Sequence, residues 1–289
     1  MKLKVGQIVG RKSYQCDILF RISSINGNVA ELYGEDVRLV ADAPIDDLVA
    51  ITEDEHRERR KKEKEKEDNC YYLFRQDSRV IKKRGDYEAT SGYSTEPSYF
   101  EIRGRVLHID GDSMYLRKCM ELYEKLGVPV YGVHVVEKEM PQQIDSLLEM
   151  VRPDILVITG HDAYLKTRGN QKDIKGYRHS KYFAETVRIA RKRVPSLDDL
   201  VIFAGACQSH FETLIKAGSN YASSPERINI HALDPVYIVA KISLTPFMDR
   251  VNVWDVLKNT ITGERGLGGI ETKGFMRRGM PISDYEDEQ

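Results

Sequence analysis

The second half of the chain alternates between short apolar runs and amphipathic helical runs, and this alternation restricts the folds that it can adopt. Strands that are apolar along nearly their whole length are typical of a sheet buried on both faces. Helical runs between such strands indicate parallel pairing, with helices covering both faces of the sheet. Four runs predict the strands: Arg105–Ile109, Val128–Val136, Asp154–Thr159 and Leu200–Ala204. We therefore expect an α/β domain over residues 104–289.

Residues 1–50 have a different pattern, made of short strand-like runs separated by turn residues. The dipeptide Asn26-Gly27 is a strong hairpin signal, and the runs Cys16–Ile22, Val29–Tyr33 and Val37–Val40 surround it. Strands of this length predict a small SH3-like β-barrel. Such barrels bind many kinds of ligand, so the fold alone predicts no ligand.

Residues 51–103 form a charged linker and connector between the two domains. The run Glu53–Asp68 has almost no apolar residue and no hydrophobic period, which indicates a solvated helix or a disordered linker. The Tyr-rich stretch from residue 70 to 103, with Gly and Ser around Ser91, is interpreted as irregular.

Composition excludes several classes of function. Charged residues make up 31% of the 289, yet the net charge is only −1, so nucleic acid is not the expected partner. Neither a signal peptide nor a membrane span is visible, so we expect a cytoplasmic protein without a membrane partner. The four cysteines are far apart, so we expect no disulfide framework, no metal and no cofactor. The sequence does not predict an oligomeric state.

Two predicted strand ends carry side chains that could take part in catalysis. The third predicted strand ends in Gly160-His161, and the fourth ends in Gly205-Ala206-Cys207. Functional sites of parallel sheets lie at the carboxyl ends of the strands, and consecutive strands are often neighbours. We therefore expect His161 and Cys207 to meet at one edge of the sheet.

This placement suits a cysteine nucleophile. A helix expected over Gln208–Ala217 would place Cys207 at its N-terminus, where the helix dipole favours the thiolate. His161 would hold a proton near the thiolate and later deliver it to the leaving amine. The alternative is that Cys207 only packs in the core and His161 is a solvated loop residue, but two such coincidences at successive strand ends favour catalysis.

The remaining cysteines and histidines fit structural roles better. Cys119 falls on the apolar face of a helix, Cys16 in a barrel strand and Cys70 at the linker edge. His108 and His134 lie in or at the end of strands, and His210 points sideways from the site. His179 and His231 are kept as supporting groups.

The strings ILVITGHD and LVIFAGAC resemble the strand ends of the caspase-like peptidases, which include caspases, legumains, clostripain, gingipains and separase. The resemblance implies a mostly parallel sheet flanked by helices, with a His-Cys catalytic dyad. It also implies an oxyanion hole made of the backbone N–H groups of Asp162 and Cys207. Asp162 stands where these peptidases usually have Gly, so its side chain could reorient the loop.

A second resemblance extends over nearly the whole chain. The strings VGQIVGRKSYQCDILFRI, RLVADAPIDDL, GHDAYLK and AGACQSHFE resemble the YabG family of sporulation-specific peptidases. It implies a cysteine endopeptidase that cleaves after Arg, or Lys, with His161 and Cys207 as its catalytic residues. The implied partners are spore coat and spore morphogenesis proteins, and the implied location is the mother cell of a sporulating bacterium, in association with the spore coat.

Two further expectations follow from a preference for Arg. A buried guanidinium needs a carboxylate, because an unpaired charge is costly to desolvate. The candidates are Asp162, Glu226, Asp234 and Asp249. We also expect the protein to cut itself between about residues 57 and 84, which releases the barrel; in the competing interpretation the linker is a rigid charged helix that resists cleavage.

Two other functions remain open. A strand-Cys-helix turn also serves glutamine amidotransferases, although Gly205-Ala206-Cys207-Gln208-Ser209 lacks their second Gly and the best His precedes the Cys. A non-enzymatic scaffold on the spore surface is the other alternative, and it leaves both strand ends without a function.

Overall fold

The computed structural model of the chain describes residues 3–91 and 99–279. Its N-terminal part is a five-stranded antiparallel sheet with the strand order β4-β3-β2-β1-β5. The strands are β1 (Ile8–Arg11), β2 (Phe20–Asn26), β3 (Val29–Gly34), β4 (Val40–Pro44) and β5 (Leu48–Ala50). The hairpin predicted at Asn26-Gly27 joins β2 to β3 and is confirmed. Among the described strands β4 and β5 end the order, so the pairing shows a sheet, and an SH3-like barrel stays a prediction.

One strand that was expected in the N-terminal sheet pairs with a different part of the chain. The run Val37–Val40 was expected to continue the N-terminal sheet, but β4 begins only at Val40. Val37 and Leu39 instead form isolated β-bridges with His231 and Asp162, which belong to the second part of the chain. A segment of the N-terminal part therefore pairs with the rim of the large sheet.

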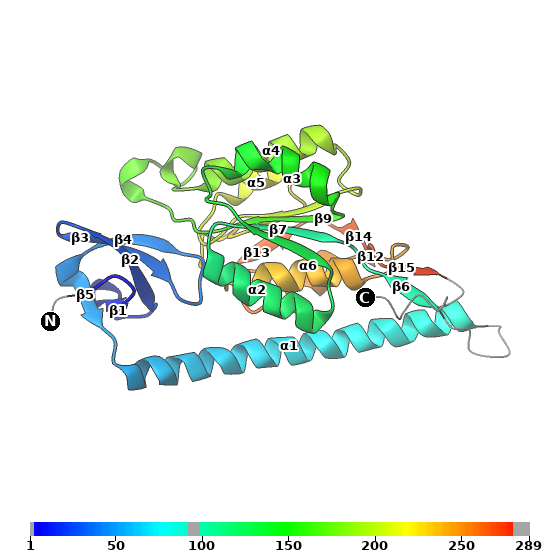
Figure 1. The fold of residues 1–289 in the computed structure, drawn as a ribbon, viewed down its shortest axis with the longest axis horizontal. Coiled ribbons are helices and arrows are strands. Elements are labelled where there is room, and N and C mark those ends of the chain that lie inside the picture. The colour runs from blue at the N-terminus through cyan, green and yellow to red at the C-terminus, as the bar shows by residue number, and fades with distance from the viewer. Residues whose placement is uncertain (1–2, 92–98, 280–289) are drawn as a thin grey trace.

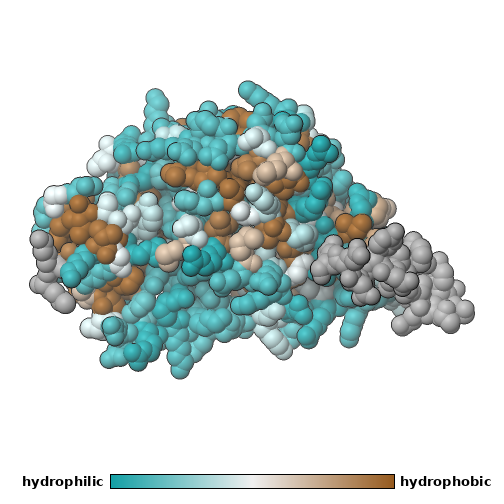
Figure 2. All heavy atoms as spheres, in the orientation of Figure 1, coloured by the Kyte–Doolittle hydropathy of each residue, from teal (hydrophilic) through white to brown (hydrophobic). Residues whose placement is uncertain are grey.

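A single helix of 38 residues, α1 (Glu53–Thr90), follows the N-terminal sheet. Thr52 caps it, because the Thr52 hydroxyl accepts a hydrogen bond from the Glu55 N–H. The helix runs along the whole length of the molecule (Figure 1), and the hydrophilic strip along that side in Figure 2 reflects its charged sequence. The helix also continues through the stretch after residue 70 that was expected to be irregular. Its own side chains Cys70 and Phe74 are buried there and anchor it.

The second part contains the predicted sheet, with the strand order β13-β11-β10-β9-β7-β8. Its strands are β7 (Val106–Asp110), β8 (Val130–His134), β9 (Ile155–Thr159), β10 (Val201–Ala204), β11 (Tyr221–Ser223) and β13 (Leu267–Gly269). All neighbours are parallel except β13, which pairs antiparallel with β11. The expectation of a mostly parallel sheet is thereby confirmed.

Helices cover both faces of this sheet (Figure 1). On one face lie α3 (Met140–Val151), α4 (Ser180–Arg193) and α5 (Phe211–Ala217), and on the other α2 (Ser113–Leu126) and α6 (Asp234–Leu244). The remaining elements are β6 (Phe100–Ile102), β12 (Arg250–Val251), α7 (Val253–Leu257), β14 (Thr272–Lys273), β15 (Arg277–Gly279) and the short 3-10 helices Lys12–Tyr14, Ile45–Asp47, Lys166–Arg168 and Ile174–Gly176.

Glycine and aspartate fix the ends of the helices that lead to the site. The Asp112 side chain accepts hydrogen bonds from two N–H groups of the first turn of α2. Gly127 and Gly218 end α2 and α5 in the left-handed conformation. The helix after Cys207 begins at Phe211 and not at Gln208, so Cys207 lies in the loop before it.

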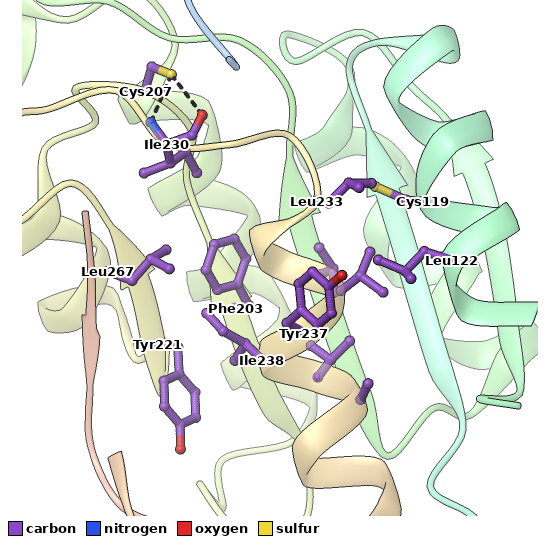
Figure 3. Packing of buried hydrophobic residues seen from close by; sticks show 14 of the residues in the cluster. Cys119, Leu122, Phe203, Cys207, Tyr221, Ile230, Leu233, Tyr237, Ile238 and Leu267 are labelled. Carbon is purple, nitrogen blue, oxygen red and sulfur yellow. Dashed lines mark hydrogen bonds between the residues drawn. The ribbon is translucent and has the colours of Figure 1, made fainter. Parts of the chain in front are cut away.

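Two apolar clusters hold the layers together. One lies between the sheet and α3, α4 and α5. The other lies on the opposite face and continues from Val106 and Phe203 into Val9, Phe20 and Leu32 of the N-terminal sheet. Figure 3 shows part of this second cluster, with Cys207 at its upper edge. In the described ranges no helix is both long enough and apolar enough to cross a membrane.

Candidate active site

The site lies where β7, β9 and β10 reach the carboxyl edge of the sheet. These three strands are adjacent, and Ala204 on β10 pairs with Ile158 on β9. The loops that follow β9 and β10 are tied by a hydrogen bond of 2.8 Å from the Thr159 hydroxyl to the Gly205 carbonyl. The predicted placement of His161 and Cys207 on neighbouring loops matches this arrangement.

His161 is buried between two carboxylates. Its backbone N–H donates to Glu137 Oε1 at 2.8 Å, and its Nδ1 lies 3.7 Å from the same oxygen. Its Nε2 lies 3.2 Å from Asp112 Oδ2, although among the described residues it has no well-directed hydrogen bond. Burial disfavours the charged ring, but the two acids outweigh burial and raise the pKa of His161. The two acids therefore stabilise the imidazolium form.

Aromatic rings close the space around the imidazole. The Tyr33 ring, from the N-terminal sheet, lies 4.2 Å from the His161 ring between centroids, and the Tyr115 ring lies at 5.4 Å. Only 1% of His161 is exposed. The N-terminal part thus covers the histidine directly.

Cys207 is fully buried, and its thiol is hydrogen-bonded to one neighbouring residue. The Sγ accepts from the Ile230 N–H at 3.2 Å and lies 3.5 Å from the Ile230 carbonyl oxygen (Figure 3). Burial raises the pKa of the Cys207 thiol. In the described residues no hydrogen bond joins Cys207 to His161, and both side chains are closed off from solvent.

The backbone N–H groups of Asp162 and Cys207 converge on one oxygen atom. Both donate to the carbonyl of Arg38, at 3.3 Å from Asp162 and 3.2 Å from Cys207. The Asp162 side chain does not crowd them, because it turns away to accept from Ser180 and from Ser209. The pair of donors expected from the sequence therefore points at a common acceptor.

The side chain of Arg38 lies in a closed pocket beside this point. Its guanidinium forms an ion pair of 2.9 Å with Asp110 and donates to the Ala232 carbonyl at 2.9 and 3.1 Å. One of its nitrogen atoms lies 3.4 Å from Cys119 Sγ. Arg38 and Asp110 are both 0% exposed.

The four acids expected to receive an arginine lie elsewhere. Asp162 is bonded to its own loop and to serines, and Asp234 accepts from the backbone of His231 and Ile261. Glu226 and Asp249 form ion pairs with Arg265 and Arg84 at the surface. The guanidinium of Arg38 forms no hydrogen bond with any of these four carboxylates, and its partners are Asp110, Cys119 and the Ala232 carbonyl.

The other cysteines and histidines have mainly structural contacts, although Cys16 lies in the turn before β2 and not in a strand as expected. Cys70 is hydrogen-bonded to Asn259 beneath α1, and His231 lies close to Glu63 and Glu67 of that helix. The ligand atoms of His108, Asp110 and Cys119 lie within 4.8 Å of one another, a grouping that could hold a metal ion. The guanidinium of Arg38 already contacts two of these three residues, so a metal ion and Arg38 exclude one another here.

Sequence reasoning missed Arg38, Asp110, Asp112 and Glu137. A signal for three of them was visible, because Asp110, Asp112 and Glu137 lie at the carboxyl ends of the first two strands of the predicted sheet, on the edge where sites form. Arg38 carries no such signal, since it comes to the site only through packing between distant segments.

These features define an α/β protein with a buried histidine and a buried cysteine at the carboxyl edge of a mainly parallel sheet. The family model described as YabG peptidase U57 matches residues 4–281, so the chain belongs to this peptidase family. It is also 59% identical over 286 residues to the sporulation-specific protease YabG of Bacillus subtilis (strain 168), covering 97% of this chain and 99% of that protein. No solved structure matches the chain.

Proposed function

We propose that the chain is a cysteine endopeptidase that cleaves after arginine, with Cys207 as the nucleophile and His161 as its proton donor and acceptor. The observation that carries the proposal is the carbonyl oxygen of Arg38, which accepts hydrogen bonds from the N–H groups of both Asp162 and Cys207. Two backbone donors aimed at one carbonyl are what acyl transfer needs to stabilise an oxyanion. Membership of a peptidase family supports the same chemistry.

The proposed reaction has two stages. His161 in its neutral form first takes the proton of the Cys207 thiol. The Cys207 sulfur then attacks the carbonyl carbon of the residue before the cleaved bond, and the negative charge that forms on the carbonyl oxygen is held by the two N–H groups. His161 gives its proton to the amine that leaves, and a thioester remains. Water, deprotonated by His161, then hydrolyses the thioester and releases the acid. Asp112 and Glu137 orient the imidazole and stabilise its positive charge.

The proposed substrates are spore coat and spore morphogenesis proteins, cut in the mother cell or on the coat. Support comes from the name of the relative, which is a sporulation-specific protease. The two alternatives considered above, a glutamine amidohydrolase and a scaffold, gain no support from a particular contact in the site.

Peptide hydrolysis tests the proposal. Cys207→Ala and His161→Ala should each lower kcat/KM on an arginine-containing peptide by at least about 1,000-fold, because residues of one catalytic unit fail together. Cys16→Ala is the matched control, since this cysteine lies in the N-terminal part and should leave the rate unchanged.

The same samples, mixed with spore coat extract and analysed by mass spectrometry, should show cuts after Arg with the wild type only. Equal activity of wild type and Cys207→Ala, or ammonia release from free glutamine without peptide cleavage, would reject the endopeptidase.

A further inference from the structure

The segment Asp36–Val40 lies across the site with isolated β-bridges on both sides and a tight turn at Arg38, where the Leu39 N–H donates to the Val37 carbonyl at 2.8 Å. On one side the Asp36 carbonyl accepts from Ala232, and the Arg38 N–H donates to Ile230 at 3.4 Å. On the other side the Arg38 carbonyl accepts hydrogen bonds from the N–H groups of Asp162 and Cys207. The Val40 N–H lies 3.5 Å from the Asp162 carbonyl. A peptide that adds a strand in this way is held by main-chain bonds, while its side chains select the sequence.

The Arg38 side chain, at the centre of this segment, enters a pocket whose polar groups match a guanidinium. Arg38 uses both its Nε and its terminal nitrogens, and the planar group is paired with Asp110 on one side and with the Ala232 carbonyl on the other. The Tyr115 ring adds a cation–π contact, with 5.1 Å between the guanidinium carbon and the ring centroid. Planar, forked recognition of this kind distinguishes Arg from Lys.

Other contacts hold Asp110 in place independently of the arginine. One carboxylate oxygen accepts from the Asp112 N–H at 3.0 Å, and the other lies 3.3 Å from His108 Nε2. Burial acts to raise the pKa of Asp110, but the positive charge of Arg38 and the hydrogen bond to His108 outweigh it and keep this pKa below its usual value. The carboxylate is thus charged and pre-oriented at the end of β7.

Arg38 therefore makes two adjacent contacts at once. Its carbonyl accepts from the N–H groups of Asp162 and Cys207, and its guanidinium forms an ion pair with the buried carboxylate of Asp110. A structural ion pair needs only the second of these contacts, and a chance main-chain contact needs only the first. We infer that Asp110 is the residue that determines specificity for arginine, and that the chain's own Arg38 occupies this pocket as a resident competitor of substrate. The inference rests on the proposed function, because it assigns the specificity of that same site.

Binding, measured without cleavage, tests the pocket. In the Cys207→Ala background, Arg38→Gln removes the guanidinium from the pocket and leaves a shorter, neutral side chain. Fluorescence polarisation then compares two labelled peptides that differ only in arginine or citrulline, its neutral isostere. With Arg38→Gln, the arginine peptide should bind about 10- to 100-fold more tightly than the citrulline peptide, the worth of a charged hydrogen-bonded contact. Adding Asp110→Asn should abolish this difference.

Two controls sharpen the result. Arg178→Gln makes the same chemical change at an arginine that joins the two parts through Glu31 and Asp42, away from the pocket, and should not raise the affinity for the arginine peptide. Where Asp110→Asn does not fold, as judged by its melting curve, Asp110→Glu is used, which moves the charge outward and should shift the preference from Arg toward Lys.

The inference is overturned by three results: an arginine preference that survives both Asp110 variants, an Arg38→Gln protein that binds no better than its parent, or an Arg178→Gln protein that gains as much. Hydrolysis assays separate it from the proposed function. If arginine peptides bind through Asp110 but are never cut by the Cys207-containing Arg38→Gln protein, the peptidase fails and the pocket stands. If they are cut without dependence on Asp110, the pocket fails and the peptidase stands.

Discussion

At the scale of one residue, His161 shows how two neighbouring acids stabilise a proton on a buried ring. Its ring lies between Asp112 and Glu137, and these acids raise its pKa above the ordinary value. A group whose pKa is raised by folding contributes stability that is fully present below the unfolded pKa of about 6.5 and is lost as the pH rises through the folded pKa. The acids themselves stay ionised in this window, so only the histidine changes its charge.

We therefore expect the wild type to lose stability between about pH 6.5 and the raised pKa of His161, and Asp112→Asn to lose less. Urea unfolding at several pH values measures this, with Asp154→Asn, at a half-exposed acid remote from the histidine, as the control. Identical pH slopes for wild type and Asp112→Asn would show that Asp112 does not hold the proton on the ring.

Single residues also mark where sequence reasoning succeeds. His161 and Cys207 could be located because strand order alone brings the ends of β9 and β10 together. The ion pair between Arg38 and Asp110 could not be predicted, since a pairing between residues 38 and 110 depends on how two separate parts of the chain dock. Asp162, expected to disturb its loop, is instead a hydrogen-bond acceptor that holds the loop in place.

The element that departs most from expectation is α1. Its first half has almost no apolar residue, and its hydrophobic anchors, Cys70 and Phe74, occupy only one stripe a turn apart. Ion pairs at helical spacing, such as Lys62 with Glu58 and Lys64 with Asp68, support it along its exposed face. A sparse stripe of this kind gives no clear hydrophobic period, so the sequence could not distinguish a docked helix from a linker.

Docking of α1 should control self-cleavage. Phe74 is 1% exposed and its ring packs 5.6 Å from that of Tyr237, so Phe74→Ala should cost about 3–5 kcal/mol of stability or helix docking. Cleavage needs an extended backbone, so the wild type should be cut slowly between residues 57 and 84 and Phe74→Ala faster. N-terminal sequencing over time measures both.

Leu73→Ala is the matched control, because this side chain is 44% exposed on the same helix. Equal cleavage of all variants in the Cys207→Ala background would point to a contaminating protease. Rapid cutting of the wild type at these arginines would mean that the helix does not protect them.

At the scale of the whole molecule, the N-terminal sheet and the α/β part share one apolar cluster. Arg178 and α1 add further ties between them, through Glu31, Asp42 and Asp36. The two parts were predicted as separate domains from their strand patterns; the mostly parallel sheet is confirmed, whereas Val37 and Leu39 pair with the second part. What the sequence did not indicate is that Tyr33 and Arg38 of the first part are buried in the site of the second.

Shared burial predicts one cooperative unfolding transition. Calorimetry of the wild type should give equal calorimetric and van't Hoff enthalpies, the mark of a two-state unit. An independent N-terminal part of about 50 residues would instead give its own transition, with an enthalpy of about 35 kcal/mol. Two resolved peaks would therefore contradict a common core.

Arg38 and the pocket that it occupies belong to the same polypeptide. The occupancy of the pocket therefore does not depend on how much of the protein the cell contains. An occupant on the same chain has a fixed effective concentration, whatever the number of molecules in the cell. Dilution does not release it, and accumulation of the protein does not strengthen it. The fraction of open sites would then be set by two quantities only, the stability of the docked segment and the local supply of competing arginine-bearing chains, so that abundant substrate would itself switch the protein on.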